Sequence, residues 1–441
     1  MHKLKFEKIF YVVISSLLII TFVLVSYIFP PYSSFENSPG GVKKIYYADY
    51  ISPAHQEIIN MFNEKYKGQI EVETINLPFE KFSTNERKEL LARYLRSKSD
   101  RIDIFAVDQI WVPRFAKWSV PLDNLISSQQ KNNILKNAME TCYYNGKLVA
   151  IPLYIDVALM YYRKDILKTL PNYKKIVTEL DSSITWDEFI ALHKELKDQA
   201  APFFTYQADN YEGLICIYDE LLESQGKSFV EDGKIQLNTP ESKRALQLLV
   251  DMVNQDNISP EIVTRLKENP SYEYYLKNNG IFLRGWPGFL ADYSTNAHYK
   301  NILTKIERVP TPHFKNGKPV SIFGGWNLMI SKFSNKIPEA AKFINFVTSE
   351  EAQKILYQKG GLLPINNQVY EDSLFLKDNK SIQFYKRLLE QGVHRPFLQS
   401  YTGISDIISY YLHEAIKKNM SVKTALDDAT DKINSGNFQL K

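Results

Sequence analysis

Strand-like and helix-like segments alternate from residue 43 onward, and this alternation restricts the fold more than any other feature of the chain. Three runs are typical of strands: residues 43–48, 69–75 and 102–107. A helical segment follows Ser52-Pro53, which supplies an N-cap and a proline for the first turn. A second helical segment surrounds residues 86–98. This order predicts an α/β fold with a mainly parallel sheet and helices on both of its faces.

Polar and aromatic side chains follow two of these strand-like runs directly. Asp49-Tyr50 comes after the first run, and Asp108 and Trp111 come after the third. In open parallel sheets, ligands bind beyond the carboxyl ends of the strands. We therefore expect Tyr50, Asp108 and Trp111 to lie close to a binding site.

The N-terminal region carries a separate signal. Residues 9–29 contain no charge and follow Lys3, Lys5 and Lys8; as a helix they would span about 31 Å, close to the thickness of a bilayer core. The run is longer than the apolar part of a usual signal peptide, and no small-residue cleavage site follows it. The preceding lysines place the N-terminus in the cytoplasm. We predict a cytoplasmic stub and signal-anchor transmembrane helix over 1–29 and a tether over 30–42.

A cleaved signal peptide is the alternative reading of the same segment. In both cases the body of the protein is exported to the outer face of the cytoplasmic membrane. No second apolar run of spanning length occurs, so the chain is not a permease by itself.

The composition and motifs exclude several classes of function. The chain has 441 residues, with a net charge of only +4 and no long basic run, which disfavours nucleic-acid binding. Cys142 and Cys216 are too few for a disulfide scaffold and show no metal spacing. None of the seven histidines forms a metal motif, and no nucleophile or phosphate-binding motif occurs. We predict no catalytic residue, metal or cofactor. Carboxylates paired only by folding would still allow an exported carbohydrate-active enzyme.

Segments along nearly the whole body match one family in order and spacing. The chain resembles the extracellular solute-binding proteins of family 1, the maltodextrin-binding-like receptors of carbohydrate ABC importers. The resemblance rests on Tyr47–Tyr66, Asp103–Trp111 with Val120–Asp123, Asn145–Pro152 with Met160–Asp165, Thr185–Phe189, and Gly324–Ser331 with Ala340–Phe346. Each segment alone is weak evidence for the family. Together the segments identify the family, but they do not identify its ligand.

The resemblance implies a two-lobed periplasmic-binding-protein fold with hinge strands and a central ligand cleft. Lobe one would comprise residues 43–153 and 323–364, and lobe two residues 157–321 and 365–441. The protein would act as a monomer, capture a sugar or oligosaccharide between the lobes, close about the hinge and deliver the ligand to ABC permease subunits.

Sugars need flat aromatic rings for their CH faces and carboxylates or amides for their hydroxyls. Trp326 follows two glycines and Trp286 is also flanked by glycines, at positions where the resemblance implies ligand contact. Asp108 and Asp156 match acidic positions of the family. The candidate ligand-binding residues are Asp108, Trp111, Asp156, Trp286, Trp326, Tyr211, Tyr50 and Tyr401.

Structural roles are open for the same residues. Asp108 could cap the helix that follows it, Asp156 could form a hydrogen bond at the hinge, and the tryptophans could pack in the core. A second function is also open: a membrane-tethered sensor subunit that passes ligand occupancy to a kinase partner. Neighbouring permease genes would favour transport, and a neighbouring sensor kinase would favour signalling.

Overall fold

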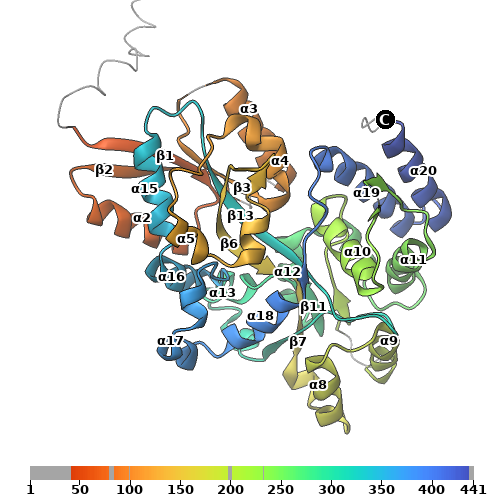
Figure 1. Cartoon of the computed structure of the whole chain (residues 1–441). Coiled ribbons are helices and arrows are strands. Elements are labelled where there is room, and N and C mark those ends of the chain that lie inside the picture. Colours follow the sequence, from red (N-terminus) through yellow and green to blue (C-terminus); the bar gives the residue numbers. More distant parts are fainter. Residues whose placement is uncertain (1–40, 79–83, 99, 197–200, 232, 437–441) are drawn as a thin grey trace, which may run out of the picture.

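The computed structural model describes residues 41–78, 84–98, 100–196, 201–231 and 233–436. Helices surround two separate larger β-sheets (Figure 1). The predicted anchor and most of the predicted tether lie outside the described residues. Within the described ranges, no helix is long and apolar enough to cross a membrane.

The first sheet begins with the predicted β-α-β-α-β unit. Its strands are β1 (Lys43–Asp49), β2 (Ile70–Asn76) and β3 (Ile104–Asp108), and its helices are α2 (Pro53–Lys65) and α3 (Thr84–Arg96). β1 pairs in parallel with both β2 and β3. The predicted strands and helices are confirmed, with boundaries that differ by a few residues.

Helix α2 shows how local signals set these elements. Ser52 accepts a hydrogen bond from the backbone N–H of His55, and Pro53 begins the helix, as the sequence predicts. Ile58, Ile59 and Phe62 recur at helical spacing and are fully buried against the sheet.

The prediction of a mainly parallel sheet is wrong for the other half of this sheet. β13 (Ser321–Ile330) runs antiparallel to β3 and to β6 (Ile151–Val157). β13 returns to this sheet after the chain has built the second one, so it enters from the opposite end. The short strand β14 (Gly392–Val393) pairs in parallel with the start of β13.

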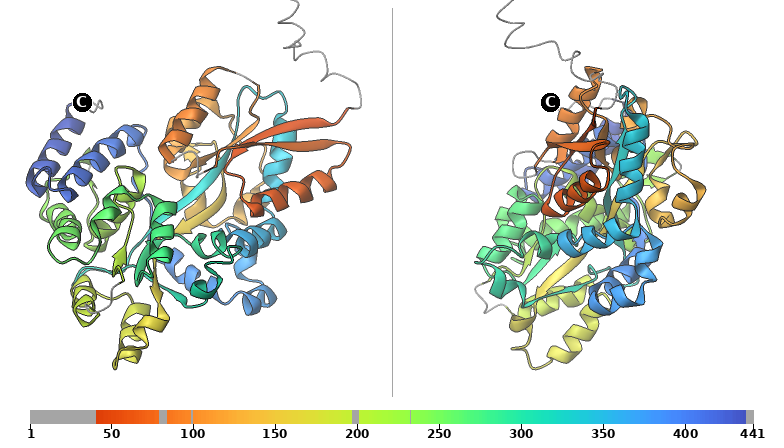
Figure 2. Two further views of the ribbon diagram at one scale, coloured as in Figure 1. Left: turned by 180° about the vertical axis from the view of Figure 1, so that it is seen from behind. Right: turned by 90° about the vertical axis from the view of Figure 1, so that its left-hand side faces the viewer.

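The second sheet has the strand order β12, β7, β11, β8. Its strands are β12 (Ile306–Val309), β7 (Leu159–Arg163), β11 (Phe282–Gly285) and β8 (Phe204–Thr205). β7 is antiparallel to both neighbours, whereas β8 and β11 are parallel. Helices α10 (Glu212–Ser224), α11 (Pro240–Asn254), α19 (Tyr401–Ile416) and α20 (Val422–Asn434) form a group in this half of the molecule (Figure 2).

Two adjacent strands carry the chain between the sheets. β6 passes through Ala158 into β7, and β13 follows the loop after β12. β6 and β13 pair antiparallel beside this crossing, and the N–H of Ala158 donates to the carbonyl of Ile322 at 3.0 Å. Figure 1 shows β13 running from the first sheet toward the second. The residue boundaries given above for the two lobes stay a prediction.

Other local predictions are also confirmed. Thr185 and Glu188 form a reciprocal capping box at the start of α9 (Trp186–Glu195). Strands β9 (Val230–Glu231) and β10 (Lys234–Ile235) pair antiparallel as the predicted hairpin. Helices α15 (Ile337–Val347) and α16 (Glu350–Gly360) follow one another, and Gly361 ends the second in a left-handed conformation.

Candidate functional site

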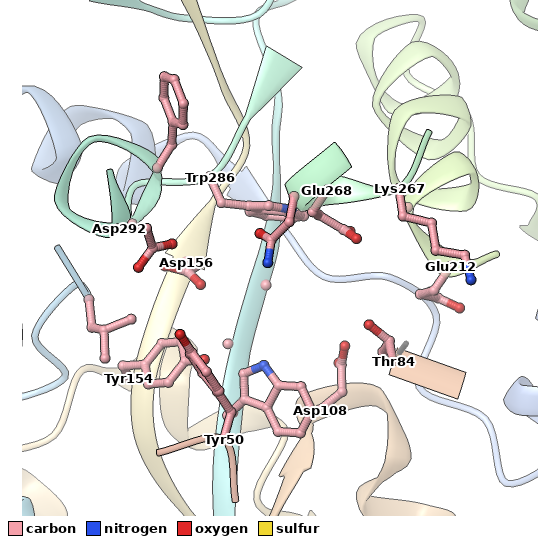
Figure 3. Close-up of a pocket in the computed structure, with 18 of the residues that line it drawn as sticks. Tyr50, Thr84, Asp108, Tyr154, Asp156, Glu212, Lys267, Glu268, Trp286 and Asp292 are labelled. Atoms are coloured by element: carbon pink, nitrogen blue, oxygen red, sulfur yellow. The ribbon is translucent and has the colours of Figure 1, made fainter. Parts of the chain in front are cut away.

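A cavity of about 370 Å³ lies between the two sheets, and we call it the inter-sheet cavity. Its first-sheet side is formed at the ends of β1 and β3 and along β6 and β13. Its other side is formed by the starts of α10 and α12 (Glu268–Lys277) and by the chain after β11. Figure 3 shows side chains from both sides pointing into this space.

Five of the eight candidate residues line the inter-sheet cavity. They are Tyr50, Asp108, Asp156, Trp286 and Trp326. Tyr50 and Asp108 reach it from the carboxyl ends of β1 and β3, where the strand order led us to expect a ligand. Ligand contact by these residues stays a prediction.

The other three candidates lie behind the cavity wall, so the structure does not place them in direct contact with a ligand. Trp111 is buried with its ring edge-on to Trp326, at 5.5 Å between centroids. Tyr401 is fully buried, and its hydroxyl donates to Oε1 of Glu212 at 2.7 Å. Tyr211 is buried under Gly213: a methyl group at Gly213 would lie 2.2 Å from the Tyr211 hydroxyl oxygen.

Trp326 is held by the first-sheet half of the molecule. The backbone of Trp326 pairs with that of Asp108 on β3. The guanidinium of Arg87 lies over the Trp326 ring, 4.1 Å from its centroid. Arg87 is itself buried in an ion pair with Asp49, at 2.9 Å. The preceding Gly325 has a φ of +128°, and a Cβ there would lie 2.6 Å from the carbonyl oxygen of Tyr154. Only glycine fits this position without strain.

Trp286 is held by the other half in a similar way. The guanidinium of Arg284 lies 4.4 Å from the centre of its ring, and Arg284 forms a buried ion pair with Glu220. The ring edge lies over Gly324, where a Cβ would be 2.9 Å from Cζ3 of Trp286. The glycine pair therefore serves both tryptophans: Gly325 permits the backbone turn before one, and Gly324 leaves room for the other.

Arg395 connects the two sides of the inter-sheet cavity. Its guanidinium donates to Oδ1 of Asp108 at 2.9 Å and to Oε1 of Glu212, at the start of α10, at 2.7 Å. Burial disfavours the charged guanidinium, but the neighbouring acidic groups, with Asp108 as the largest, outweigh it and raise the pKa of Arg395 well above its usual value. Arg395 therefore stays charged and ties β3 to α10.

Asp108 has both of the roles that the sequence left open. Its carboxylate accepts a hydrogen bond from the N–H of Ile110 at 3.2 Å, which caps the short helix that follows. It also faces the cavity. Burial raises the pKa of Asp108, while the charge of Arg395 opposes this rise.

Asp156 lies in a strongly perturbed environment in the cavity wall. It lies on β6, opposite Gly324 of β13. Burial raises its pKa to about 8, and the charges of Asp292 and Asp108 add to the rise. Its Oδ1 is buried and has no hydrogen-bond partner within the described part of the chain. A ligand donor in the cavity would satisfy this atom.

Several cavity residues were missed by the sequence analysis. They include His55, Tyr154, Glu212, Glu268, Asp292 and Arg395. Arg395 follows β14 in irregular chain and shows no local pattern that could have identified it. Glu212 had a weak signal, because it begins α10 directly after Tyr211, which was itself a candidate.

His55 is neutral at neutral pH because burial lowers its pKa. Its Nδ1 lies 2.7 Å from the hydroxyl of Ser52, which holds the ring in the first turn of α2. Within the residues that the structure describes, no group of three or more His, Cys, Asp or Glu side chains could hold a metal ion. The site is a polar and aromatic cavity that can accept and donate hydrogen bonds and stack flat ligand faces.

Comparisons with known proteins agree with this architecture. The family model of the bacterial extracellular solute-binding proteins matches residues 44–354. The chain is 26% identical over 372 residues to a probable ABC transporter-binding protein of Deinococcus radiodurans, covering 80% of this chain and 84% of that protein. It is 22% identical over 305 residues to the maltodextrin-binding protein MdxE of Bacillus subtilis, covering 67% and 68%.

Solved structures share the fold over nearly all of the chain. The maltose-bound MalE3 of T. maritima matches with a TM-score of 0.81 and 27% identity, covering 90% of this chain and 100% of that one. A Thermotoga lettingae solute-binding protein bound to α-D-tagatose matches with a TM-score of 0.77 and 22% identity, covering 90% and 99%. The two-lobed α/β fold expected from the sequence is confirmed.

Proposed function

The chain belongs to the bacterial extracellular solute-binding proteins, and we propose on this basis that it captures a sugar or oligosaccharide for an ABC importer. The ligand binds in the inter-sheet cavity and passes to permease subunits in the membrane. The protein acts as a monomer and performs no catalysis of its own.

The observation that carries this proposal is the convergence of two tryptophans and several carboxylates on one cavity from opposite sides. Trp326 and Asp108 come from the first-sheet side, and Trp286 and Glu212 come from the other. Aromatic faces suit the CH faces of sugar rings, and carboxylates accept hydrogen bonds from hydroxyls. A volume of about 370 Å³ lies in the range of ~300–1,000 Å³ typical of small-molecule sites.

The same geometry supports capture by closure. We take residues 43–153 with 323–364 as one lobe and 157–321 with 365–441 as the other, joined by the crossing at β6 and β13. A ligand that contacts both lobes at once stabilises the closed state by its difference in affinity for the closed and open states. Contacts from one lobe alone would not favour closure.

Isothermal titration calorimetry and thermal melting of the full chain test this function. The protein is purified in a detergent without a sugar head group and titrated with mono- and oligosaccharides. A ligand at about 100 times its dissociation constant stabilises the folded state by roughly 2.7 kcal/mol, which shifts the melting temperature measurably. Binding of a saccharide that is lost in a Trp286→Ala variant supports the proposal. A panel of sugars that neither releases heat nor shifts the melting temperature contradicts it.

We further propose that residues 9–29 remain on the mature protein and anchor it to the outer face of the cytoplasmic membrane. The length of the apolar run and the absence of a small-residue cleavage site support this. N-terminal sequencing of protein from washed membranes tests it. A mature N-terminus within or after this run would show that the segment is a cleaved signal peptide.

A further inference from the structure

Three polar contacts join the two halves of the molecule outside the inter-sheet cavity. Nδ2 of Asn85 donates to Oδ1 of Asp406 at 3.3 Å, and Nζ of Lys88 lies 3.8 Å from Oδ2 of the same carboxylate. The guanidinium of Arg114 donates to the hydroxyl of Thr402 at 3.2 Å. These five residues, all within the described ranges, do not line the cavity. A ligand can therefore occupy the cavity without touching them.

The contacts connect elements that belong to different halves of the molecule. Asn85 and Lys88 lie on α3, and Arg114 lies on α4 (Val112–Phe115), which follows β3 of the first sheet. Thr402 and Asp406 lie on α19, which groups with α10, α11 and α20 in the other half (Figure 1). A movement that separates the two halves on this side therefore breaks all three contacts.

The helix α19 is fixed to its own half by a neighbouring face. Thr402 and Asp406 are four positions apart, so they lie one turn apart on the face that meets α3 and α4. The hydroxyls of Tyr401 and Ser405, also four positions apart, both donate to the carboxylate of Glu212 at the start of α10. Glu212 lines the cavity, so α19 is attached directly to the cavity wall. A movement of this wall carries Thr402 and Asp406 with it.

The burial of Lys88 makes the contact between the halves depend on Asp406. The side chain of Lys88 is only 4% exposed, and a buried ammonium group is costly unless an opposite charge pairs with it. Asp406 supplies this charge from the other half. Burial raises the pKa of Asp406, and the charge of Lys88 opposes this rise. Without the Asp406 carboxylate, Lys88 stays buried and loses this partner for as long as the halves remain in contact.

We propose that Thr402 and Asp406 raise the ligand affinity of this protein without touching the ligand, by stabilising the state in which the two lobes are closed. The inference rests on the proposed capture by closure and adds positioning residues that lie outside the cavity. The contacts form without a ligand, so a fraction of the ligand-free molecules is closed. The apparent dissociation constant is the intrinsic constant divided by the fraction of molecules in the binding-competent state. Weaker contacts therefore lower the affinity although the cavity itself is unchanged.

Spin-label distances on the ligand-free full chain test the closed state directly. Labels at Arg93→Cys on α3 and Asp428→Cys on α20, both exposed positions, report the separation of the two halves, because α20 packs against α19. Cys142 and Cys216 are buried, so they stay unlabelled in the folded protein. We expect two populations in the otherwise unchanged chain, one with a short distance from closed molecules and one with a long distance from open molecules.

Four variants of the labelled chain assign the closed population to its residues. Asp406→Ala should lower the ratio of short to long distances by about threefold, the effect expected for the loss of a hydrogen bond. Asp406→Asn should have an intermediate effect, because it still accepts from Asn85 but no longer carries a charge for Lys88. Thr402→Val keeps the shape and removes the acceptor for Arg114, so it should also lower the ratio. Glu414→Ala is the control, because this carboxylate of α19 contacts only neighbouring residues of its own half among the described residues.

Calorimetry with glucose, maltose and maltotriose separates this inference from the proposed function. The dissociation constant of a sugar that binds the wild type should rise in Asp406→Ala by up to the factor by which the closed population falls. A ligand-free wild type with only the long distance, or equal distance ratios in wild type, Asp406→Ala and Thr402→Val, overturns the inference and leaves sugar binding intact. Failure of all three sugars to bind counts against the proposed function, and the distances measured without ligand then decide the inference alone.

Discussion

The guanidinium of Arg87 lies 4.1 Å from the centre of the Trp326 ring, between that ring and the carboxylate of Asp49. The same arrangement occurs on the other side of the cavity, where Arg284 connects Trp286 to Glu220. In each half of the molecule a buried ion pair fixes the orientation of a cavity tryptophan. The rings are therefore held in place before a ligand arrives, which reduces the entropy that binding has to remove.

The two tryptophans should respond differently to substitution by alanine. Trp286 is half-buried, so Trp286→Ala should weaken saccharide binding by about 2 kcal/mol or more with a smaller effect on folding. Trp326 is only 8% exposed and packs on Trp111, so Trp326→Ala should also lower the free energy of unfolding by about 3–5 kcal/mol. Calorimetry and denaturant unfolding on both variants measure the two effects. Equal losses of stability would contradict the closer packing of Trp326 against Trp111.

Substitution of Arg395 should lower the free energy of unfolding more than substitution of a surface cation does. Arg395→Met leaves Asp108 and Glu212 buried without their shared partner, and we expect a loss of about 3–5 kcal/mol in the free energy of unfolding. Lys423→Met, which breaks an exposed ion pair with Asp427 on α20, is the control and should have little effect. Denaturant unfolding at neutral pH compares them. Similar stabilities for the two variants would show that the Arg395 bridge does not stabilise the fold.

A methyl group should be far less tolerated at Gly325 than at another glycine of positive φ. Gly325→Ala brings a Cβ to 2.6 Å from the carbonyl oxygen of Tyr154 and strains a φ of +128°, so it should cost more than about 3 kcal/mol and perturb Trp326. Gly68→Ala has a φ of +77° and meets no atom within 4 Å, so it should cost only about 1–2 kcal/mol. Thermal melting and tryptophan fluorescence distinguish the two. Wild-type tryptophan fluorescence in the Gly325→Ala variant would contradict the close approach between residue 325 and the carbonyl oxygen of Tyr154.

Stability should fall as pH rises because of Asp219. This residue of α10 is fully buried, and burial raises its pKa well above the usual value; Glu212, Glu220 and Glu223 add to the rise and Arg395 opposes it. The folded state holds the Asp219 proton more tightly than the unfolded state does. The contribution of Asp219 to the free energy of unfolding is therefore fully present below the pKa that this residue has in the unfolded chain. It is lost as the pH rises toward the pKa of Asp219 in the folded protein, with a slope of at most about 1.4 kcal/mol per pH unit.

The variant Asp219→Asn tests this pH dependence. It should match the wild type near pH 4 and exceed it increasingly as the pH rises from there, as measured by urea unfolding across the range. The exposed Glu57→Gln serves as control and should follow the wild-type curve. Parallel curves for wild type and Asp219→Asn would show that Asp219 does not bind an extra proton on folding.

Local signals were sufficient for much of the fold. Ser52-Pro53 and the Thr185–Glu188 capping box predicted the starts of two helices, because capping depends on residues within a few positions of one another. The direction of β13 could not be predicted in this way. It depends on which strand the chain meets on its return from the second sheet, and no short segment encodes that.

By itself the sequence determined the strand and helix segments, the family, four cavity residues at strand ends or after glycines, and a fifth, Asp156, through the resemblance to the family. These features depend on local backbone chemistry and on patterns along the chain. Only the tertiary structure decided that Trp111, Tyr211 and Tyr401 lie behind the cavity wall. It also brought Arg395 between Asp108 and Glu212, residues separated by 287 and 183 positions from it along the chain. Buried charges can be placed only after folding brings their partners within a few ångströms, because desolvation and pairing depend on distance in space.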